Sequence, residues 1–492
     1  MLTGAEVAAH SSRKSCWIVI GLQVYDITSF LSQHPGGANI LLRNAGTDAT
    51  AAYGIYHSLD YIDQLPAGSY LGPLDPNTAK DMALAKSTST QPVSPGEENM
   101  TPHLSLCVRV SNFEAPAKAI LSNKSWVYAS ATANSGQSMR RNLDDWSLIS
   151  FRPRALRDVE NIDMRRPILG HDSQYPFFVS SMGTLGSAHS SAEFGLVKGI
   201  APKGVYTVIS TASTKSAEEI MQTLVDQQKE GNSTSPAQLY FQLYIPTDRN
   251  RAKALIQKVK RAGYKGLWIT VDAPVLGKRT ADRYLQAQEA LELGVEEEAI
   301  PLVKEAGGKN SFAPAFGGRA VPGQLSSSLT WKDLKWIREE WPGPIVLKGI
   351  QSAADAKLAA EYGCQGVLLS NHGGRQSHGS PSSLLTLLEI RTYYPEVLSS
   401  IEVFVDGGLR DGADVLKALC LGATAVGIGR PILYALAAYG AAGVEKCLDI
   451  LAEELSIGMK LLGITSLDQA NPDLVNASPL MSGIWRPDSS RL

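Results

Sequence analysis

Polar side chains follow several short apolar runs in the second half of this 492-residue sequence. The densest set is the string SNHGGRQ at residues 370–376, which offers a histidine and, three residues later, an arginine. Other run ends carry carboxylate, hydroxyl, amide and basic groups, at Gln242, Tyr244, Thr270, Asp272, Arg279, Lys348, Asp406, Arg410 and Arg430. Any one of these could be solvated or part of a turn, but their joint occurrence at successive run ends predicts a shared site.

These residue types supply the parts needed to oxidise a hydroxy acid. His372 with a carboxylate to orient it is a general-base arrangement, and Arg375 suits a substrate carboxylate. Lys348 at a strand end can stabilise negative charge that develops on a bound cofactor. Glycines beside Arg410 and Arg430 can hold a phosphate through free N–H groups and a guanidinium. Together they indicate oxidation of a hydroxy acid by a phosphate-bearing cofactor.

Two histidines near the amino-terminal end form a second candidate site. His34 opens the turn HPGG at residues 34–37, and His57 follows after the mostly apolar stretch Ala38–Tyr53, which we expect to be helical. Two neutral imidazoles can clamp a haem iron from both sides, which leaves no position for oxygen and favours electron transfer. The alternative is a turn-capping His34 and a surface His57, but the glycines after His34 and the spacing favour the haem site.

The polar residues at the run ends must be positioned by the elements around them, which alternate between β-rich apolar runs and helix-like segments. Eight such runs occur, at Pro176–Met182, Val205–Thr211, Leu239–Tyr244, Leu267–Ala273, Pro344–Ile350, Val367–His372, Val403–Gly408 and Ala425–Pro431. The segments between them include Ser216–Gln228, Asp248–Ala262, Ala353–Tyr362 and Gly412–Leu421. The pattern predicts the α/β class and a closed (β/α)8 TIM barrel, whose chemistry sits at the carboxyl ends of the strands. The charged, glycine-rich insertion Arg283–Leu329 is expected to be a lid, a binding loop or a mobile segment.

Residues 1–75 form a smaller predicted unit in front of the barrel. Trp17–Ile20 and Val24–Ile27 predict two short strands around Gly21. This unit has three basic and six acidic residues, so it would favour a basic partner. Residues 76–102 are polar and interrupted by prolines, which is typical of a linker. We expect the barrel domain to span 103–475 and a tail to span 476–492.

Composition excludes several classes of protein. Apolar residues make up 44% and charged residues 19%, as in ordinary soluble globular proteins. The formal net charge of −2 argues against a nucleic-acid binder, and no apolar run approaches the roughly 20 residues of a membrane span. The five cysteines are scattered without a C-x-x-C pair. We therefore expect neither a disulfide framework nor a zinc site, and we expect the protein to work in a reducing compartment.

Both units resemble known families. Residues 1–75 resemble a cytochrome b5 domain, because WIVI at 17–20, YDIT at 25–28, HPGG at 34–37 and the later His57 fall in that family's order. From about Ser105 to Val475 the chain resembles the FMN-dependent α-hydroxy-acid dehydrogenase/oxidase family, most specifically through SNHGGRQ at 370–376. The order of the two units resembles that of the flavocytochrome b2 family. The resemblance implies a small α+β domain that binds haem b and a barrel that binds FMN.

The resemblance also implies roles for individual residues. The flavin ring and ribityl chain would contact Ser210, Gln242, Thr270, Lys348 and Ser370. The ribityl and phosphate groups would be held by Asp406, Gly407, Gly408, Arg410, Gly429 and Arg430. In the same way, Tyr128 and Arg375 would bind the substrate carboxylate, and Tyr244 would bind the substrate hydroxyl. His372 would be the base, paired with Asp272 and with the positive charge of Arg279 nearby, and the iron would be held by His34 and His57.

Some positions depart from the family pattern. The family's usual Pro/Ala-Thr-Ala is replaced here by SMG at 181–183. Its Ser-Gly-Ala is replaced by ATA at 131–133, and its Leu-Asp by SH at 377–378. Ala212 stands where relatives often carry a bulky residue over the substrate. Together with Gly183, it predicts a roomier pocket and a substrate larger than lactate.

The expected activity is oxidation of an (S)-2-hydroxy acid, lactate-like or larger, to a 2-oxo acid. Electrons would pass from FMN to the haem and on to a basic acceptor such as cytochrome c. Two alternatives stay open: an oxygen-using oxidase with a vestigial haem domain, and an electron-transfer module on a barrel that has lost catalysis. The intact set Tyr128, Tyr244, Asp272, Lys348, His372 and Arg375 argues against the second.

The carboxyl-terminal Ser490, Arg491 and Leu492 form a variant of a peroxisomal address. The cytochrome-like motif begins within a few residues of Met1, which leaves no visible mitochondrial presequence. We therefore expect a peroxisomal or cytoplasmic protein, and the resemblance implies a homo-oligomer, a tetramer.

Overall fold

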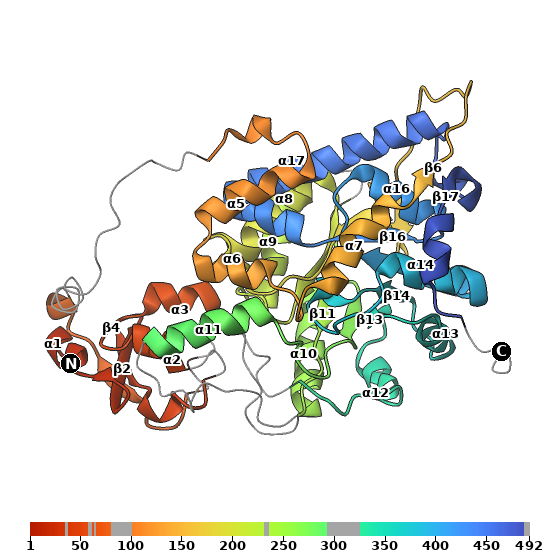
Figure 1. Ribbon diagram of the computed structural model, residues 1–492. Helices are drawn as coiled ribbons and strands as arrows, with labels where there is room; N and C mark the ends of the chain where they lie inside the picture. The colour runs from red at the N-terminus through yellow and green to blue at the C-terminus, as the bar shows by residue number, and fades with distance from the viewer. Residues whose placement is uncertain are drawn as a thin grey trace.

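The computed structural model describes residues 1–34, 38–57, 62, 65–79, 101–230, 236–292 and 325–486. The HPGG glycines, most of the predicted linker, most of the predicted insertion and the carboxyl-terminal address lie outside these ranges. Figure 1 shows a small amino-terminal unit beside a larger unit of strands surrounded by helices. None of the helices in the described ranges is long and apolar enough to cross a membrane.

Eight parallel strands form a closed barrel in the order β9 to β16, and β16 pairs back to β9. The strands are β9 (Phe177–Val179), β10 (Tyr206–Ser210), β11 (Leu239–Leu243), β12 (Leu267–Thr270), β13 (Ile345–Ile350), β14 (Gly366–Leu369), β15 (Glu402–Asp406) and β16 (Ala425–Ile428). Each of the eight predicted runs contains one of these strands, so the predicted TIM barrel is confirmed.

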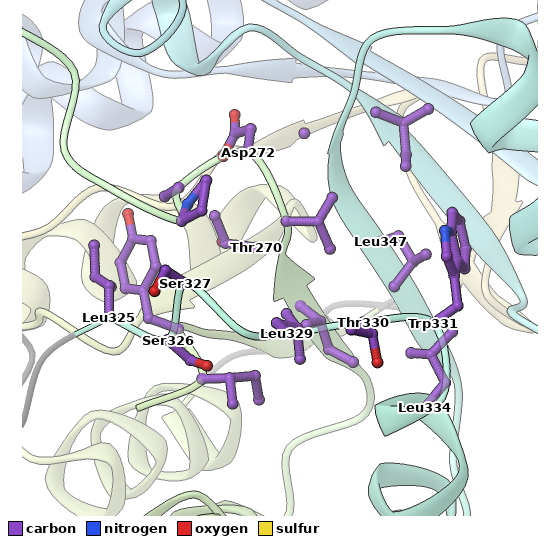
Figure 2. Close-up of a pocket in the computed structure, with 18 of the residues that line it drawn as sticks. Thr270, Asp272, Leu325, Ser326, Ser327, Leu329, Thr330, Trp331, Leu334 and Leu347 are labelled. Carbon is purple, nitrogen blue, oxygen red and sulfur yellow. The ribbon is translucent and has the colours of Figure 1, made fainter. Parts of the chain in front are cut away.

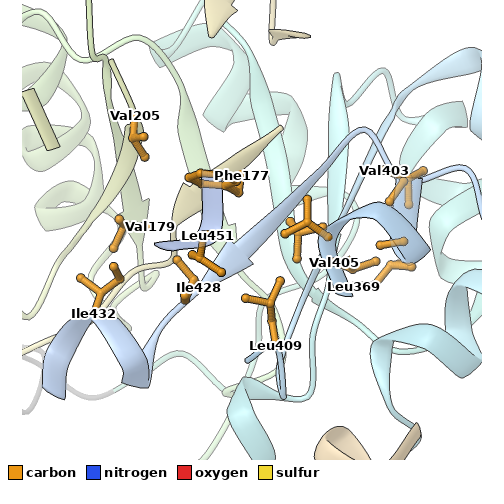
Figure 3. Close-up of a cluster of buried hydrophobic side chains, with 14 of the residues drawn as sticks. Phe177, Val179, Val205, Leu369, Val403, Val405, Leu409, Ile428, Ile432 and Leu451 are labelled. Carbon is orange, nitrogen blue, oxygen red and sulfur yellow. The ribbon is translucent and has the colours of Figure 1, made fainter. Parts of the chain in front are cut away.

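Helices surround the barrel and cover the apolar outer side of its strands. They include α8 (Ala192–Ile200), α9 (Ala217–Glu230), α10 (Arg249–Ala262), α12 (Asp333–Glu340), α13 (Ala353–Glu361), α14 (Ser383–Tyr393), α16 (Gly412–Cys420) and α17 (Arg430–Leu462). Helix α11 (Thr280–Glu292) packs instead against α6 (Asn123–Ser130). Figure 3 shows this layer, in which Val179 and Ile428 of neighbouring strands lie beside Ile432 and Leu451 of α17. Burial of this apolar area is the main force that holds the helices against the strands.

Large aromatic side chains fill the barrel interior and close its amino-terminal end. Five of them are at most 1% exposed, namely Phe178, Tyr206, Tyr240, Trp268 and Phe404. A hairpin of β7 (Arg166–Ile168) and β8 (His171–Ser173) lies under them, because the Tyr240 hydroxyl donates to the Ile168 carbonyl at 3.0 Å. Since Tyr240 stands near the start of β11, the filled end is the amino-terminal one, and the carboxyl ends of the strands remain for a site.

The amino-terminal unit is a five-stranded sheet with short helices. Its strands are β1 (Ser11–Ser12), β2 (Ser15–Ile20), β3 (Gln23–Asp26), β4 (Thr47–Asp48) and β5 (Tyr70–Pro73). The predicted strands around Gly21 are confirmed, since β2 and β3 form a hairpin whose turn residues Gly21 and Leu22 both have positive φ. Its core consists of side chains such as Cys16, Ile18 and Ile27.

The prediction of one continuous helical stretch over Ala38–Tyr53 is wrong. Helix α2 (Ala38–Arg43) ends before Gly46, and α3 (Thr50–Tyr56) begins after β4. Gly46 has a φ of 71°, and a side chain there would contact the backbone of Ala8, so the chain turns here and places β4 beside β2.

Candidate functional site

A pocket opens at the carboxyl ends of the barrel strands. It is lined by most of the residues predicted for flavin and substrate: Tyr128, Ser210, Tyr244, Arg279, Lys348, His372, Arg375, Asp406, Gly407, Gly408, Arg410, Gly429 and Arg430. The strand register brings these ends to one level, since Ser210 pairs with Gln242 and Thr270 with Lys348. Gln242, Thr270, Asp272 and Ser370 are buried directly behind the lining rather than on its surface.

His372 lies at the centre of a hydrogen-bonded group in this pocket. Its Nδ1 is 3.0 Å from Asp272 Oδ1 and 3.5 Å from Lys348 Nζ, and its Nε2 is 3.3 Å from the Tyr244 hydroxyl. Burial, and then the positive charge of Lys348, lowers the pKa of His372 to about 4. A neutral imidazole with a buried carboxylate behind it can accept a proton and be stabilised once it has done so.

Burial by itself would raise the pKa of the Asp272 carboxyl. The neighbouring His372 and Lys348 outweigh this effect and hold that pKa below its usual range. Asp272 is therefore ionised, and its side chain is fully buried against the imidazole that it orients.

Gly349 and the turn after β14 explain how these groups converge. The pairing of β13 with β14 shifts between Lys348 and Ile350, and Gly349 has a φ of 103°. A side chain at Gly349 would collide with the Asp272 carboxylate. The irregular strand end thus lets Lys348 and Asp272 approach the same imidazole, as β-bulges near active sites commonly do. His372 itself adopts a φ of 60°, a conformation rare for residues other than glycine.

The arginines of the pocket are anchored by backbone carbonyls at the end of helix α6 (Asn123–Ser130). Arg375 Nη1 donates to the carbonyls of Tyr128 at 2.7 Å and Ala131 at 3.0 Å. Arg430 donates to Ala129 and Ala131, each at 3.0 Å. These contacts also satisfy carbonyls that a helix end leaves without partners. The departure ATA at 131–133 is thus compatible with the site, since Ala131 acts through its backbone.

The pocket has an excess of positive charge that no carboxylate on its surface neutralises fully. Burial, and then the charge of Arg279, lowers the pKa of Arg375 to about 9, and burial lowers the pKa of Arg430 as well. Arg279 Nε is buried and has no hydrogen-bond partner in the described part of the chain. An anion in this pocket would complete these interactions, as a carboxylate or a phosphate does.

The residues present also fit an FMN group. Asp406 Oδ2 accepts a hydrogen bond from Ser180 at 3.2 Å, while Asp406 Oδ1 is buried with no hydrogen-bond partner among the described residues. At Gly429 a side chain would meet no atom within 4 Å other than those of its neighbours in the chain, which marks open space beside this backbone. The buried chain from Ser210 Oγ to Gln242 Oε1 (3.1 Å) and from Gln242 Nε2 to Thr270 Oγ1 (2.8 Å) fixes polar groups beside it.

Helix α7 (Gln137–Ser147) contributes site residues that the sequence analysis missed. Asn142 and Asn371 exchange two amide hydrogen bonds of 2.7 Å, and Asn371 Oδ1 also accepts from the Gly374 amide at 2.9 Å. Trp146 donates to the Gly407 carbonyl at 3.0 Å. This helix therefore joins the His372 turn to the glycines of the predicted phosphate site. The local sequence of this polar helix carries no signal that Asn142 is buried.

The departures Gly183 and Ala212 lie against each other in the pocket wall. A Cβ atom at position 183 would stand 2.9 Å from the Cβ of Ala212. Both residues line the same pocket as Tyr244 and Arg375. The third departure, Ser377 and His378, is exposed at the surface and leaves the pocket unchanged.

A second pocket borders β12 and β13 on a different side (Figure 2). Figure 2 shows Asp272 at its edge, with Leu325, Leu329, Trp331 and Leu347 around it. Its lining includes neither His372 nor any of the four arginines of the first pocket. We therefore place the chemistry in the first pocket.

In the amino-terminal unit, the rings of His34 and His57 lie with their centroids 6.1 Å apart and their planes at 70°. Metal–imidazole bonds of about 2.0 to 2.1 Å on both sides of one ion, with half of each ring added, give a separation of about 6 Å. The geometry thus fits an iron between the two histidines. Leu31 and Tyr25 belong to the apolar core of the same unit.

Comparisons with known proteins agree with both sites. Residues 117–477 match the FMN-dependent dehydrogenase family, and residues 3–75 match the cytochrome b5-like heme/steroid binding domain. The cytochrome-type L-lactate dehydrogenase of Saccharomyces cerevisiae is 36% identical and covers 97% of this chain and 80% of its own. That of Wickerhamomyces anomalus is 34% identical, with coverage of 96% and 80%.

A solved structure extends the comparison to the barrel. It is a flavocytochrome b2 variant with one leucine-to-alanine substitution and benzoylformate, 35% identical, with a TM-score of 0.67 and coverage of 80% of this chain and 93% of that chain. FMN supplies two-electron oxidation in such a pocket and haem b supplies one-electron transfer. This chain therefore belongs to the FMN-dependent dehydrogenase family, as a 2-hydroxy-acid dehydrogenase with a cytochrome b5-like haem domain in front of its barrel.

Proposed function

We propose that the enzyme oxidises an (S)-2-hydroxy acid whose side chain is larger than the methyl group of lactate. The observation that carries this proposal is the mutual contact of Gly183 and Ala212 in the wall of the pocket. Gly183 has no side chain and Ala212 only a methyl group, so neither projects far into the pocket, and we infer that a branched or aromatic substrate group fits beside them. The related flavocytochrome b2 variant with a leucine-to-alanine substitution holds benzoylformate, an aromatic 2-oxo acid, and this supports the same direction.

We propose the following roles within the site. Arg375 and Tyr128 bind the substrate carboxylate, because Arg375 is held over the Tyr128 ring at 5.0 Å and lacks a carboxylate partner at the pocket. Tyr244 binds the substrate hydroxyl, and His372 takes one proton from the substrate with Asp272 behind it. FMN, when bound, would accept the two electrons together with the second hydrogen of the substrate, which leaves the 2-oxo acid. Arg279 adds positive charge beside the carboxylate.

The proposed cofactor ligands follow from the same geometry. The FMN ring and ribityl chain would lie on Ser210, Gln242, Thr270, Lys348 and Ser370, and its phosphate among Gly407, Gly408, Gly429, Arg410 and Arg430. His34 and His57 would hold the haem iron. No step of the proton transfer depends on these ligands, whose task is to fix the cofactors in place.

Substitution of Ala212 by leucine tests the proposed substrate class. We expect Ala212→Leu to lower kcat/KM for (S)-mandelate and to leave L-lactate less affected, so that the ratio shifts toward lactate by about tenfold or more. Initial rates of the holoenzyme with both acids measure this ratio. The matched control is Ala212→Gly, which should keep the native preference for the larger acid. A native enzyme that turns over lactate far better than mandelate and longer 2-hydroxy acids would contradict the proposal.

We propose that the electron acceptor is a protein with a basic surface, such as cytochrome c. The haem unit carries six acidic and three basic residues, which supports such a partner. The nearly full-length relatives are named for a cytochrome acceptor, and this disfavours the oxygen-using alternative. A homotetramer is proposed only from the resemblance of the barrel to its family.

We propose a peroxisomal address at Ser490, Arg491 and Leu492, which lie outside the described residues. In a peroxisome, where cytochrome c is not expected, the acceptor would have to be a different basic protein. Removal of these three residues should move an amino-terminally tagged chain from peroxisomes to the cytosol, as seen by fluorescence microscopy. Retention in peroxisomes without them, or a cytosolic full-length chain, would contradict this address.

A further inference from the structure

The haem domain rests on the rim of the flavin pocket through a cluster of charges centred on Glu289. Glu289 of α11 has a side chain only 9% exposed, and it pairs with two cations on different elements. Lys124 of α6 lies 3.2 Å away within the barrel unit, and Arg43 of α2 reaches it at 3.4 Å from the haem domain. Figure 1 shows α11 beside α2 and α3 of the haem domain.

A second contact of the haem domain lies at the 3₁₀ turn η6 (Leu185–Ser187). A side chain at Gly186 would collide with the carbonyl of Ile55 in α3, the helix that leads directly into His57. This contact is independent of the charge cluster around Glu289, because it depends only on the absence of a side chain at Gly186. The haem-ligand helix therefore approaches the barrel closely at this point.

The elements under the haem domain also form the walls of the flavin pocket. Helix α6 carries Lys124 at its start and Tyr128 in the pocket, and its last carbonyls hold Arg375. Helix α11 begins directly after Arg279, and η6 follows Gly183 closely in the chain. Docking on these three elements thus brings the haem domain to the mouth of the pocket from which its electrons come.

The contact between the two units is polar and incompletely packed, as in reversible interfaces. A cavity remains between them, lined by Arg43, Ser122, Lys124, Leu285 and Glu289. Arg43 keeps 43% of its side chain exposed, whereas Lys124 keeps 16%. A polar, partly open contact of this kind is typical of units that separate and return rather than of a fused core.

We infer that Glu289 is a positioning residue that holds the haem domain on the rim of the pocket, with Arg43 as its partner across the contact, and so sets the rate of electron passage from the flavin pocket to the haem. In the described part of the chain, Glu289 does not line the flavin pocket, and its ion pairs are with Arg43 and Lys124. The inference rests on the electron path between the two units and is independent of which hydroxy acid is oxidised.

The test separates the two half-reactions in the full-length holoenzyme. The protein is mixed without oxygen with L-lactate or (S)-mandelate, whichever reduces it faster, and flavin bleaching and haem bands are followed separately. In Glu289→Gln we expect flavin bleaching at the native rate and haem reduction slower by a factor of about 3 to 10, because two cations then face each other without an acid. Haem reduction at the native rate would overturn the inference.

Further variants distinguish docking from a defect of the barrel. Arg43→Ala should slow haem reduction less than Glu289→Gln, and the double variant should be no slower than Glu289→Gln alone, since one contact is removed in both. Arg13→Ala is the matched control, because Arg13 is exposed on the same domain and has no ion pair among the described residues. Multiplicative effects of the two substitutions, or equal slowing of flavin bleaching, would overturn the inference.

Native haem reduction should also slow as ionic strength rises, because salt screens the partly exposed pair of Arg43 and Glu289. The same increase in salt should change Arg43→Ala much less. An identical salt response in both proteins would show that this pair does not hold the domain, and would overturn the inference as well.

Discussion

Replacement of His372 by glutamine is expected to lower the rate of flavin reduction by about 10³-fold or more, while FMN stays bound. Glutamine keeps a polar side chain of similar reach, but it cannot accept a proton at neutral pH, and general bases contribute about 10²- to 10⁴-fold. The contacts proposed for the phosphate lie on other loops, at Gly407, Gly408 and Arg430. Rapid mixing with a 2-hydroxy acid in the absence of oxygen measures the rate, and the absorbance of the purified protein measures bound FMN.

His378→Gln is the matched control for this variant. His378 lies six residues further along the same loop and is exposed, so its replacement should leave flavin reduction at the native rate. Loss of FMN from His372→Gln would show that the turn, rather than the proton acceptor, has been damaged. A nearly native rate with FMN bound would remove His372 as the base.

The pH profile gives a second measurement on the same residue. Because burial and then Lys348 lower the pKa of His372 to about 4, the imidazole of the free enzyme is neutral throughout the physiological range. The value of kcat/KM should therefore be flat around neutrality and fall only as pH drops through about 4, where His372 becomes protonated and loses its acceptor nitrogen. A fall already between pH 6 and 7 would mean that burial and Lys348 do not lower the pKa of His372 in the working enzyme.

The sequence was sufficient to predict the barrel and most of its site, for a physical reason. Each strand end carries its functional group within a few residues of a strongly apolar run, as Asp272 and Lys348 do, and parallel strands of a barrel must end at the same rim. The type of each residue and its position after a strand are then enough to predict that these groups meet, whatever sequence lies between them. The pairing of Ser210 with Gln242 and of Thr270 with Lys348 confirms this argument.

The missed features depend on contacts between segments far apart in the chain. Asn142 meets Asn371 across 229 positions, and nothing in the local pattern of α7 distinguishes it from a solvated asparagine. The break in the predicted helix over Ala38–Tyr53 follows from the approach of Gly46 to α1 (Gly4–Ala9), again a tertiary contact. Glu289 and Arg43 each look like ordinary surface charges, and only the docked units show that they form a pair.

Replacement of His57 by alanine is expected to abolish haem reduction while the barrel still bleaches its flavin within about twofold of the native rate. The two rings of His34 and His57 stand 6.1 Å apart, so removal of one leaves an iron with a single protein ligand. The proton acceptor His372 is held separately, by Asp272 and Tyr244 of the barrel. The haem bands of the purified protein and the reduction of added cytochrome c both measure the loss.

The exposed His103 provides the control, because His103→Ala removes a histidine at the start of the barrel unit without touching either site. It should keep both the haem bands and the transfer to cytochrome c. If His57→Ala retained native haem bands and native reduction of cytochrome c, the iron would have to lie elsewhere. If flavin bleaching stopped as well, the two units would share one cooperative site, which the separate hydrogen-bonded groups around His372 argue against.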